Sequence, residues 1–464
     1  MNKKYGMVTT QKPMANVVMG FSKRESLNNI NSNENLSSID RKKDTIPSRI
    51  QTIKGLLDGK NLDLMVNFDN TETENFIYPS GYKDSDSGDS SRDSSLDTVR
   101  STDSRYILNK KMHDFRNIIK QIGGKLCYIK SGTSGHTFKG IINNEDGTKI
   151  NYAVKVVAYK KREKYGGIND IARPENAELM MIKLLSYFVV KGYTPHIVLP
   201  IGTFNTNINN FINLVDDGYV KKESKKYQDF LENYKKNYYH DQVSILISEW
   251  ANRGDLLDFI RNNYREITLT VWKVFFFQIL SVLAVIQYKY PTFRHNDLKA
   301  NNILVQKVIK KGRNCRYTVN KIKYKLPNIG YQLKLWDFDF ACIPGTINNA
   351  KVDAKWTNEI NVNPVQNRYY DMHYFFNTLI NKGFFPKFMT DDTIPKEAKE
   401  FVNRIVPPIY QNSEYVTEKG RILVNTEYLT PEKVLKSDVF FEEFRVTNDK
   451  LQIQSRDTKH RKKV

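Results

Sequence analysis

Residues 293–305 read FRHNDLKANNILV, and this stretch carries the most specific chemical pattern in the chain. Asp297 is followed by Lys299 two residues later and by Asn302 five residues later, just before an apolar run typical of a strand. A carboxylate can accept the proton of a hydroxyl group, and a lysine can neutralise charge on a migrating phosphoryl group. An amide oxygen is a hard ligand of the kind that Mg²⁺ prefers. The spacing therefore predicts phosphoryl-transfer chemistry.

A second segment places a lysine inside an apolar strand. Residues 152–156 read YAVKV, so Lys155 is flanked by residues that favour burial. A buried lysine is rare unless a carboxylate neutralises it, although a lysine on an edge strand can also extend its amine into solvent. The predicted helix at 175–190 offers Glu178 as the partner of Lys155, with Glu175 as the alternative.

Two more segments have the composition of a phosphate and metal site. Residues 333–340, LKLWDFDF, predict a strand that ends at Asp337, whose carboxylate can chelate a metal bound to phosphates. Residues 129–140, IKSGTSGHTFKG, join two predicted strands, and their glycines allow backbone amides to approach a polyphosphate. Taken alone, the glycine-rich segment is more typical of an ordinary hairpin turn.

In this order and with these spacings, the four segments resemble the eukaryotic-type protein kinase family over residues 120–445. The resemblance implies an α+β fold with two lobes, a small β-rich lobe followed by a larger helical lobe. It also implies ATP as the phosphoryl donor, Mg²⁺ or Mn²⁺ as the cofactor, and the serine and threonine hydroxyls of proteins as acceptors.

The resemblance also assigns roles to particular residues. Asp297 matches the catalytic base, Lys299 and Lys155 match the lysines that stabilise the phosphoryl groups, and Asn302 and Asp337 match the metal ligands. The nucleotide-binding positions that the resemblance implies are Lys130, Ser131, Gly132, Thr133, Ser134, Gly135, Thr137, Ala153, Lys155, Glu178, Glu249, Ala251 and Leu304. Of these, Lys130 replaces the usual first glycine of the loop, and Thr137 replaces the usual valine over adenine. Ser248 falls at the gatekeeper position before the hinge, and Asp371 falls where a helix aspartate braces the catalytic loop.

Several positions depart from the family pattern. Asn296 stands where the arginine that clamps an activation-loop phosphate is usual, and Asp339 stands where a glycine is usual. No Ala-Pro-Glu motif occurs between Asp337 and Asp371. In combination, the motifs are most similar to the serine/threonine kinases of large DNA viruses, of the poxvirus virion kinase type. That narrower resemblance implies action in a cytoplasmic virus factory or in the virion.

Composition limits the possible partners and compartments. The chain has 464 residues, of which 72 are Lys or Arg and 51 are Asp or Glu, giving a formal charge of +21 that favours anionic partners. Only three cysteines occur and none forms a CxxC pair, which fits a reducing compartment. No secretory signal follows the N-terminus, and the apolar run 271–290 contains polar residues, so we expect a buried helix there and no membrane span.

The densest basic segment is 306–334, with nine Lys or Arg residues and no acid. A solvated surface loop, a docking site for acidic substrates and contact with nucleic acid or lipid headgroups are the open interpretations. Because no sequence-specific nucleic-acid signature occurs, acidic protein substrates or an anionic membrane are favoured. No feature of the sequence fixes an oligomeric state.

The predicted organisation has four parts. Residues 1–105 are rich in Asn, Ser and Asp and are expected to be largely disordered, with two short apolar runs, 50–57 and 62–68, as candidates for docking. The serines and aspartates of 84–104 suit autophosphorylation. The other predicted parts are an N-lobe at 106–250 with an insertion near 205–242, a C-lobe at 251–446 with the basic insertion, and a basic tail at 447–464. A pseudokinase scaffold and a kinase-like small-molecule phosphotransferase remain as alternative functions.

Overall fold

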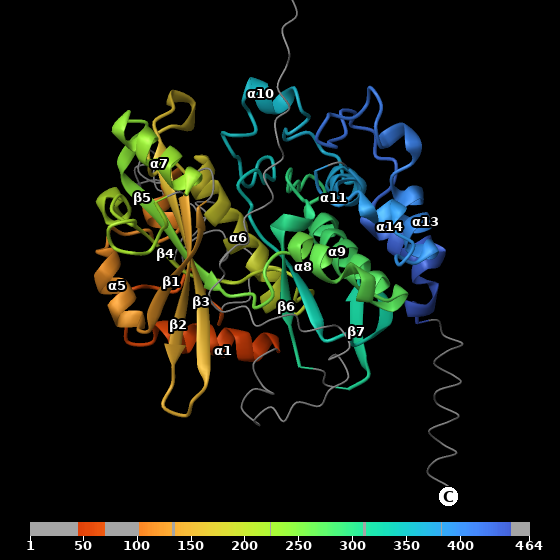
Figure 1. Cartoon of the computed structure of the whole chain (residues 1–464), viewed down its shortest axis with the longest axis horizontal. Coiled ribbons are helices and arrows are strands. Elements are labelled where there is room, and N and C mark those ends of the chain that lie inside the picture. The colour runs from red at the N-terminus through yellow and green to blue at the C-terminus, as the bar shows by residue number, and fades with distance from the viewer. Residues whose placement is uncertain are drawn as a thin grey trace, which may run out of the picture.

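A computed structural model describes a sheet-rich N-terminal part followed by a helical C-terminal part (Figure 1). The described residues are 45–69, 102–131, 135–222, 224–309, 312–381 and 383–446. The predicted α+β class, in which strands come first and helices later, is confirmed at this level.

Five antiparallel strands form the main sheet, in the order β1-β2-β3-β5-β4. They are β1 (Lys125–Ser131), β2 (Gly135–Asn143), β3 (Lys149–Lys160), β4 (Pro200–Asn207) and β5 (Tyr239–Glu249). The central strand is β3, whose register places Lys155 opposite Thr137 of β2 and Leu246 of β5. Because side chains alternate along a strand, the buried Val154 and Val156 lie on the opposite face from Lys155.

The position of β4 corrects the sequence prediction, which placed a strand at 197–201 and an insertion from 205. The strand instead runs from 200 to 207, and its polar side chains are buried with hydrogen-bond partners. Thr203 Oγ1 donates to the carbonyl of Ile245 at 2.7 Å, and Asn205 Oδ1 accepts from the hydroxyl of Tyr159 at 2.8 Å. Burial of satisfied polar groups explains why a polar segment forms an interior strand.

Helices dominate the C-terminal part and also flank the sheet. They are α1 (Ile46–Leu57), α4 (Ser104–Ile107), α5 (Phe115–Ile122), α6 (Pro174–Val190), α7 (Lys225–Lys235), α8 (Leu256–Asn263), α9 (Leu269–Lys289), α10 (Lys355–Asn358), α11 (Tyr370–Ile380), α12 (Lys387–Thr390), α13 (Lys396–Ile405) and α14 (Pro431–Ser437). The predicted helices near 175–190, 255–262, 269–288 and 367–381 are confirmed. The predicted helix at 431–445 is interrupted at Asp438, because α14 ends there and a 3₁₀ turn follows over Val439–Phe444.

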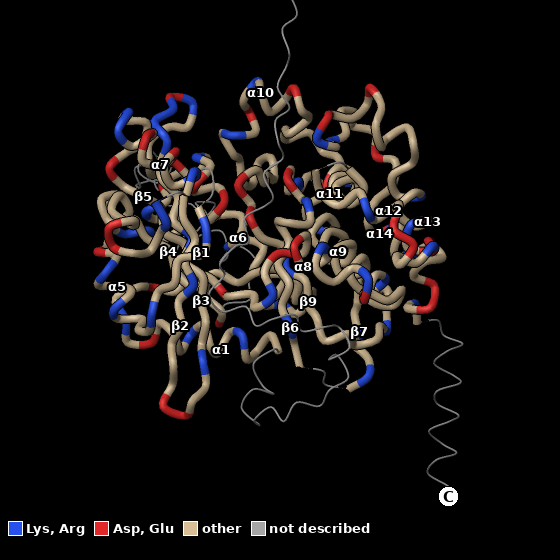
Figure 2. The backbone as a smooth tube through the Cα atoms, viewed as in Figure 1, with Lys and Arg blue, Asp and Glu red and all other residues tan. Residues whose placement is uncertain are grey.

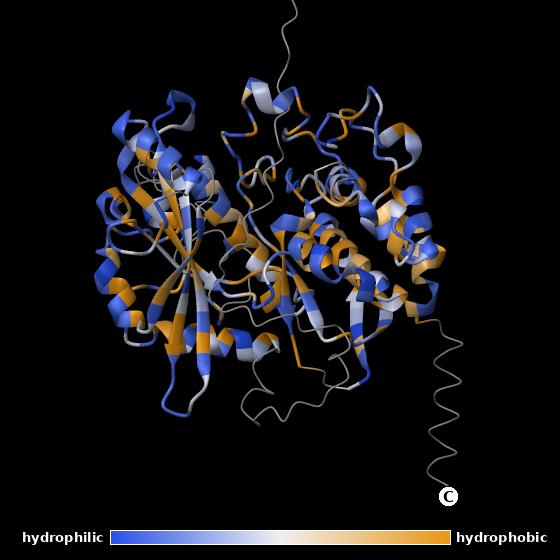
Figure 3. Ribbon diagram, viewed as in Figure 1, coloured by the Kyte–Doolittle hydropathy of each residue, from blue (hydrophilic) through white to orange (hydrophobic). Residues whose placement is uncertain are grey.

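Helix α9 is the apolar centre of the C-terminal part, where hydrophobic residues are interspersed with hydrophilic ones along the helices (Figure 3). Trp272, Phe276 and Phe277 are each at most 1% exposed, and Phe276 packs against Phe376 and Phe401. Among the described residues, α9 is the one helix long and apolar enough to cross a membrane. Since 83% of its apolar window is buried inside the molecule, the prediction of a buried helix is confirmed.

The basic segment 306–334 folds as paired strands. Strand β6 (Ile303–Lys307) pairs with β9 (Tyr331–Leu335), and between them β7 (Asn314–Val319) pairs with β8 (Ile322–Pro327). One face of the β7–β8 hairpin is apolar, because Tyr317 and Tyr324 both pack edge-on against Phe277 of α9. The hairpin is therefore anchored to the core through aromatic contacts.

Residues 45–69 contain the two short apolar runs that the sequence marked as candidates for docking. Thr45 caps α1 by accepting a hydrogen bond from the backbone N–H of Ser48, and the run 62–68 lies along β4. The N–H of Met65 donates to the carbonyl of Ile201 at 2.9 Å, and Leu62 packs where a side chain at Gly202 would stand. Both short apolar runs thus dock on the folded part, as the sequence allowed.

A buried ion pair fixes α1 to the end of the sheet. Arg49, which is 5% exposed, contacts both carboxylate oxygens of Glu249 at 2.7 Å and donates to the carbonyls of Pro195 and Ile197. Burial alone would raise the pKa of Glu249, but the charges of Arg49 and Lys334 outweigh burial and lower that pKa to about 2. Helix α1 is therefore attached to the segment that connects the sheet to the helical part.

Replacing Arg49→Met leaves Glu249 buried with a weaker set of partners, so we expect the free energy of unfolding to fall by about 3 kcal/mol at pH 7. Because the pKa of Glu249 is lower in the folded state than its ordinary value of 4.5, the ion pair stabilises fully above that pH. The difference between variant and wild type should narrow as the pH falls from 4.5 toward about 2. Denaturant unfolding at several pH values measures both effects.

Lys54→Met is the matched control, because it lies on the same helix and its ion pair with Asp69 is exposed. It should change the free energy of unfolding by less than about 1 kcal/mol. Equal effects of the two substitutions would contradict the assignment of α1 docking to Arg49.

Candidate active site

Lys155 lies between two carboxylates that come from different parts of the chain. Its Nζ is 2.5 Å from Glu178 Oε1 on α6 and 2.7 Å from Asp337 Oδ1 just after β9. Of the two partners that the sequence left open, the structure pairs Lys155 with Glu178. Glu175 instead contacts Arg173, with 3.0 Å between Oε2 and Nε.

The charges in this cluster influence each other strongly. Burial disfavours the charged form of Lys155, but Asp337 and Glu178 together raise its pKa above the usual range. Burial would likewise raise the pKa of Asp337, yet the charge and hydrogen bond of Lys155 hold that pKa below its ordinary value. For Glu178, burial raises the pKa more than Lys155 lowers it. The cluster therefore holds one firmly charged lysine and one firmly ionised carboxylate, that of Asp337.

The residues of the 293–305 segment converge on Asp297, which is 8% exposed. Lys299 Nζ and Asn302 Nδ2 both lie 2.9 Å from Asp297 Oδ2, and Asn302 Nδ2 also donates to the carbonyl of Asp297 at 2.8 Å. The three residues that the sequence pattern singled out are thus in direct contact. One carboxylate oxygen receives a lysine and an amide donor at the same time.

A buried aspartate fixes the backbone just before Asp297 through hydrogen bonds. Asp371 of α11 accepts the backbone N–H groups of His295 at 2.7 Å and Asn296 at 2.9 Å, and His295 Nε2 lies 3.0 Å from the carbonyl oxygen of Trp336. Asn296 (φ 63°) and Asp337 (φ 64°) adopt left-handed backbone conformations, which are uncommon for residues other than glycine. Such conformations persist where the surrounding structure enforces them, as these hydrogen bonds do.

Asn302 and Asp337 flank a pair of strands, since Ile303 of β6 lies opposite Leu335 of β9. Asn302 directs its amide nitrogen to Asp297, so Oδ1 is its atom that can face a cation. Within the described ranges, no group of three His, Cys, Asp or Glu side chains forms a complete metal cage. Two oxygen donors supplemented by substrate phosphates are a normal arrangement for Mg²⁺, so this donor set fits that ion.

The predicted nucleotide-binding residues lie mainly on the sheet. Ala153 is opposite Ser248 in the β3–β5 register, both are buried, and Ala251 is 6% exposed just after β5. Leu304 lies on β6 and is partly buried. The side chain of Glu249 turns toward Arg49, so only the backbone of Glu249 can meet a nucleotide.

The glycine-rich segment is described only at its two ends. Gly132, Thr133 and Ser134 lie outside the described residues. Lys130 is exposed and Ser131 is buried at the end of β1, whereas Gly135 opens β2 so close to β3 that a Cβ atom would lie 1.7 Å from the carbonyl oxygen of Val156. Gly135 is therefore required by strand packing, independently of any phosphate.

The insertion near 205–242 packs against the start of β2. His136, which is 1% exposed, is surrounded by the rings of Phe211, Tyr227 and Phe230, with centroids 6.3, 5.6 and 4.6 Å away. Burial lowers the pKa of His136 to about 4, so the ring is neutral at physiological pH. The insertion thus surrounds the start of β2 with aromatic rings.

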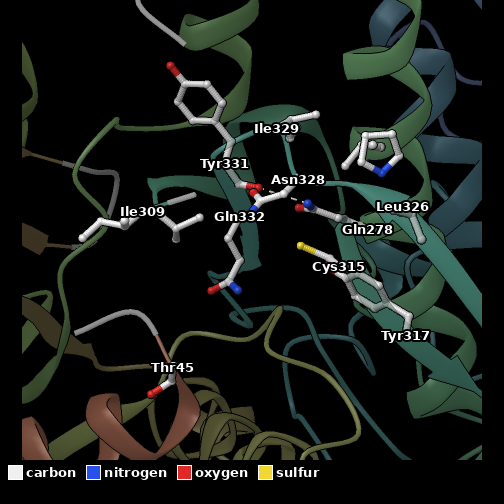
Figure 4. Close-up of a pocket in the computed structure, with 13 residues that line it drawn as sticks. Thr45, Gln278, Ile309, Cys315, Tyr317, Leu326, Asn328, Ile329, Tyr331 and Gln332 are labelled. Atoms are coloured by element: carbon white, nitrogen blue, oxygen red, sulfur yellow. Dashed lines mark hydrogen bonds between the residues drawn. The ribbon is translucent and has the colours of Figure 1, made fainter. Parts of the chain in front are cut away.

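A cavity of about 190 Å³ lies elsewhere, between the start of α1 and the strands of the basic segment (Figure 4). Its lining includes Thr45, Cys315, Tyr317 and Gln332. It contains none of the predicted site residues. Gln278 of α9 lines the cavity, and its Nε2 donates to the carbonyl oxygen of Tyr331 at 3.1 Å.

Sequence reasoning missed two arginines that contact predicted site residues. Arg49 contacts Glu249 from 200 positions upstream, and Arg421 contacts Asp297 from 124 positions downstream. Neither arginine lies in a motif, and no periodic pattern marks them. Contacts so distant in sequence depend on the complete fold.

Comparison with known proteins supports these findings. The sequence pattern that defines the poxvirus serine/threonine protein kinase family matches residues 141–442. The chain belongs to this family. R400 of Acanthamoeba polyphaga mimivirus, named as a serine/threonine-protein kinase, is 46% identical over 89% of this chain and 83% of its own length. Serine/threonine-protein kinase 2 of monkeypox virus is 25% identical over 48% of this chain and 45% of its own length, and the swinepox virus kinase of the same name is 26% identical.

This family membership makes the chain a viral serine/threonine protein kinase, as the resemblance implied. Family and relatives are named as protein kinases, so the alternatives of a scaffold or a small-molecule phosphotransferase are set aside. ATP use follows from the family.

The lysine–glutamate contact yields a test of the site geometry. Glu178→Gln replaces one carboxylate partner of Lys155 and should lower kcat for protein phosphorylation by about 10- to 100-fold, the range expected for loss of one charge-assisted hydrogen bond. Glu175→Gln is the matched control on the same helix, and its kcat should stay close to wild type. A larger loss in Glu175→Gln, at equal folded fraction, would contradict the observed pairing.

Proposed function

We propose that this viral serine/threonine kinase has two lobes, at 106–250 and 251–446, and transfers the γ-phosphoryl group of ATP with Asp297 as the catalytic base. The observation that carries the proposal is the convergence of Lys299 and Asn302 on one oxygen of Asp297. The separate cluster around Lys155 supports it, because a lysine held by two carboxylates is positioned to meet phosphates.

The proposed step balances as a phosphoryl transfer. Asp297 accepts the proton of a serine or threonine hydroxyl, whose oxygen forms a bond to the γ-phosphorus of ATP. The bond from that phosphorus to the bridging β,γ-oxygen breaks, and ADP leaves. Lys299 then faces the acceptor side of the phosphoryl group, and Lys155 faces the α and β phosphates, so charge is neutralised on both sides.

The nucleotide pocket that we propose uses the sheet as one wall. Ala153 and Leu304 enclose the adenine, and the backbone from Glu249 to Ala251 supplies its hydrogen bonds. We propose that residues of the glycine-rich segment complete the phosphate side, namely Lys130, Ser131, Gly132, Thr133, Ser134, Gly135 and Thr137. Because Arg49 holds the Glu249 side chain away from this pocket, adenine recognition relies on main-chain groups.

Asn302 and Asp337 are the residues that would hold Mg²⁺. When bound, the ion supplies positive charge to the β and γ phosphates. Asp337 already lies beside Lys155, and its low pKa keeps the carboxylate ionised as a hard oxygen ligand over the physiological range.

Protein substrates follow from the family, and we propose that acidic segments are preferred. The β7–β8 hairpin exposes Arg313, Arg316, Lys321 and Lys323 on the side away from α9, and Figure 2 shows Lys and Arg along this region. None of these four forms an ion pair within the part of the chain that the structure describes. Unneutralised cations attract acidic protein, and anionic lipid is the competing partner.

The serines of 84–104, proposed for autophosphorylation, lie outside the described residues. We place the activity in the virus factory or virion, because the relatives are viral proteins.

Asp297→Asn tests the proposed base. The amide keeps the size of the side chain but cannot accept a proton, so kcat should fall by about 10³-fold or more while the melting temperature stays near wild type. Incorporation of labelled γ-phosphate into casein measures the rate. Asp258→Asn on α8 is the control, because its carboxylate pairs with Arg261 at the surface. Phosphoryl transfer at the wild-type rate by Asp297→Asn would contradict the assignment of Asp297 as the catalytic base.

Charge reversal tests the basic hairpin. Arg316→Glu with Lys323→Glu should raise KM for the acidic protein casein several-fold, leave kcat unchanged and weaken the salt dependence of KM. Lys396→Glu with Lys399→Glu on α13 changes the net charge equally and serves as the control. An unchanged casein KM, with loss of binding to phosphatidylserine vesicles, would instead assign the hairpin to a membrane.

A further inference from the structure

Arg421 contributes a second cation to the predicted catalytic aspartate. Its guanidinium donates through Nη2 to Asp297 Oδ1 and through Nη1 to the carbonyl of Asn296 and to the hydroxyl of Tyr370 at 3.1 Å. The group is 8% exposed and stacks over Tyr374 with 4.2 Å between Cζ and the ring centroid. Burial would lower the pKa of Arg421, but the surrounding tyrosines and Asp297 raise it, so the charge persists.

The loop that carries Arg421 is fixed to the helical part by side-chain amides. Asn377 of α11 donates to the carbonyl of Gly420 at 2.9 Å, and Asn361 donates to that of Ile422 at 3.0 Å. The N–H of Arg421 itself is bound by Thr417 Oγ1 at 3.0 Å. Gly420 has φ 83°, and a Cβ atom there would lie 3.2 Å from the Asn377 amide. These hydrogen bonds therefore hold the loop, and with it the guanidinium of Arg421, in a fixed position beside Asp297.

The hydrogen bonds distinguish the two oxygens of Asp297. Oδ2 receives Lys299 and Asn302, and these two donors fill its two lone pairs. Oδ1 receives only Arg421 among the described contacts, so one lone pair remains on that oxygen. A substrate hydroxyl therefore has Oδ1 as its acceptor, and Arg421 is the group that fixes the direction of this oxygen.

The residues just before Asp297 do not supply a cation to its carboxylate, so the guanidinium comes from Arg421, which is distant in sequence. Position 296 holds no arginine, and the Asn296 amide is engaged with the carbonyls of Phe340 at 3.1 Å and Asn363 at 3.3 Å. Arg294 is also engaged, because it binds the carbonyl of Asn361 at 2.5 Å. Neither residue of the loop itself is directed to the Asp297 carboxylate.

We propose that Arg421 is a positioning residue for phosphoryl transfer, which holds Asp297 Oδ1 in the orientation that accepts the proton of the substrate hydroxyl. This proposal rests on the assignment of Asp297 as the base. Arg421 then acts through Asp297 and touches neither ATP nor the acceptor. A positioning role predicts a loss in kcat, with little change in KM for ATP.

The test compares Arg421→Ala and Arg421→Lys with wild type in steady-state phosphorylation of casein. We expect kcat of Arg421→Ala to fall by about 10- to 100-fold, with KM for ATP within about twofold of wild type. Arg421→Lys should recover part of the loss. Added guanidinium ion at millimolar concentration, below its denaturing range, should restore activity to Arg421→Ala in a saturable manner and should not activate Asp297→Asn.

The control is Arg404→Ala, because Arg404 on α13 forms an exposed ion pair with Asp438 and lies outside the site. Wild-type kcat in a folded Arg421→Ala protein would overturn the proposal, while an inactive Asp297→Asn would leave the base assignment intact. Activity retained by Asp297→Asn would overturn the base assignment instead. A loss in Arg421→Ala that guanidinium does not relieve, accompanied by a lower melting temperature, would make Arg421 a structural residue and also overturn the proposal.

Discussion

One lysine shared by two carboxylates sets the geometry of the molecule. Lys155 lies on the central strand β3, Glu178 on the packed helix α6, and Asp337 just after β9 in the C-terminal part. An isolated buried charge is too costly to persist, so Lys155 needs a carboxylate partner, and both of its partners come from elements outside β3. The cluster therefore fixes the sheet relative to the helical part. Because Asp337 follows the strand paired with β6, the same contact also fixes the position of the loop that carries Asp297.

Three added segments reinforce this centre from different directions. Helix α1 reaches the connection after β5 through Arg49, and the insertion containing α7 packs aromatic rings around His136 at the start of β2. The loop after α13 reaches Asp297 through Arg421. Two of these segments bring a buried arginine to an acidic residue of the proposed site, and the insertion brings aromatic rings to the start of β2. These segments thus replace flexibility near the site with fixed contacts, which favours a pre-organised enzyme.

The sequence was most informative where chemistry restricts residue type within a short span. Lys155 within an apolar strand, Asp297 with Lys299 and Asn302, and Asp337 at a strand end were all visible. The structure pairs Lys155 with Asp337 and, in a separate cluster, Lys299 and Asn302 with Asp297. Local patterns failed where burial and polarity disagree: Thr203 and Asn205 look like loop residues but form the interior of β4 through hydrogen bonds. Within 45–69 they marked the two apolar runs as candidates for docking, but they could not name the partners, Glu249 and β4. Arg421 could not be recognised, because the partner of a lone arginine is defined only once the chain has folded.

The docking of α1 has a consequence for how the chain is made. Arg49 leaves the ribosome 200 residues before Glu249, the acid that it binds. At roughly 5–20 residues per second, α1 waits for about 10–40 s with the apolar side chains of Ile53, Leu56 and Leu57 uncovered. During synthesis this segment is therefore a site where a chaperone can bind the nascent protein. Within the N-terminal part, the helix that is translated first is then among the last elements able to dock, because its partner Glu249 ends β5.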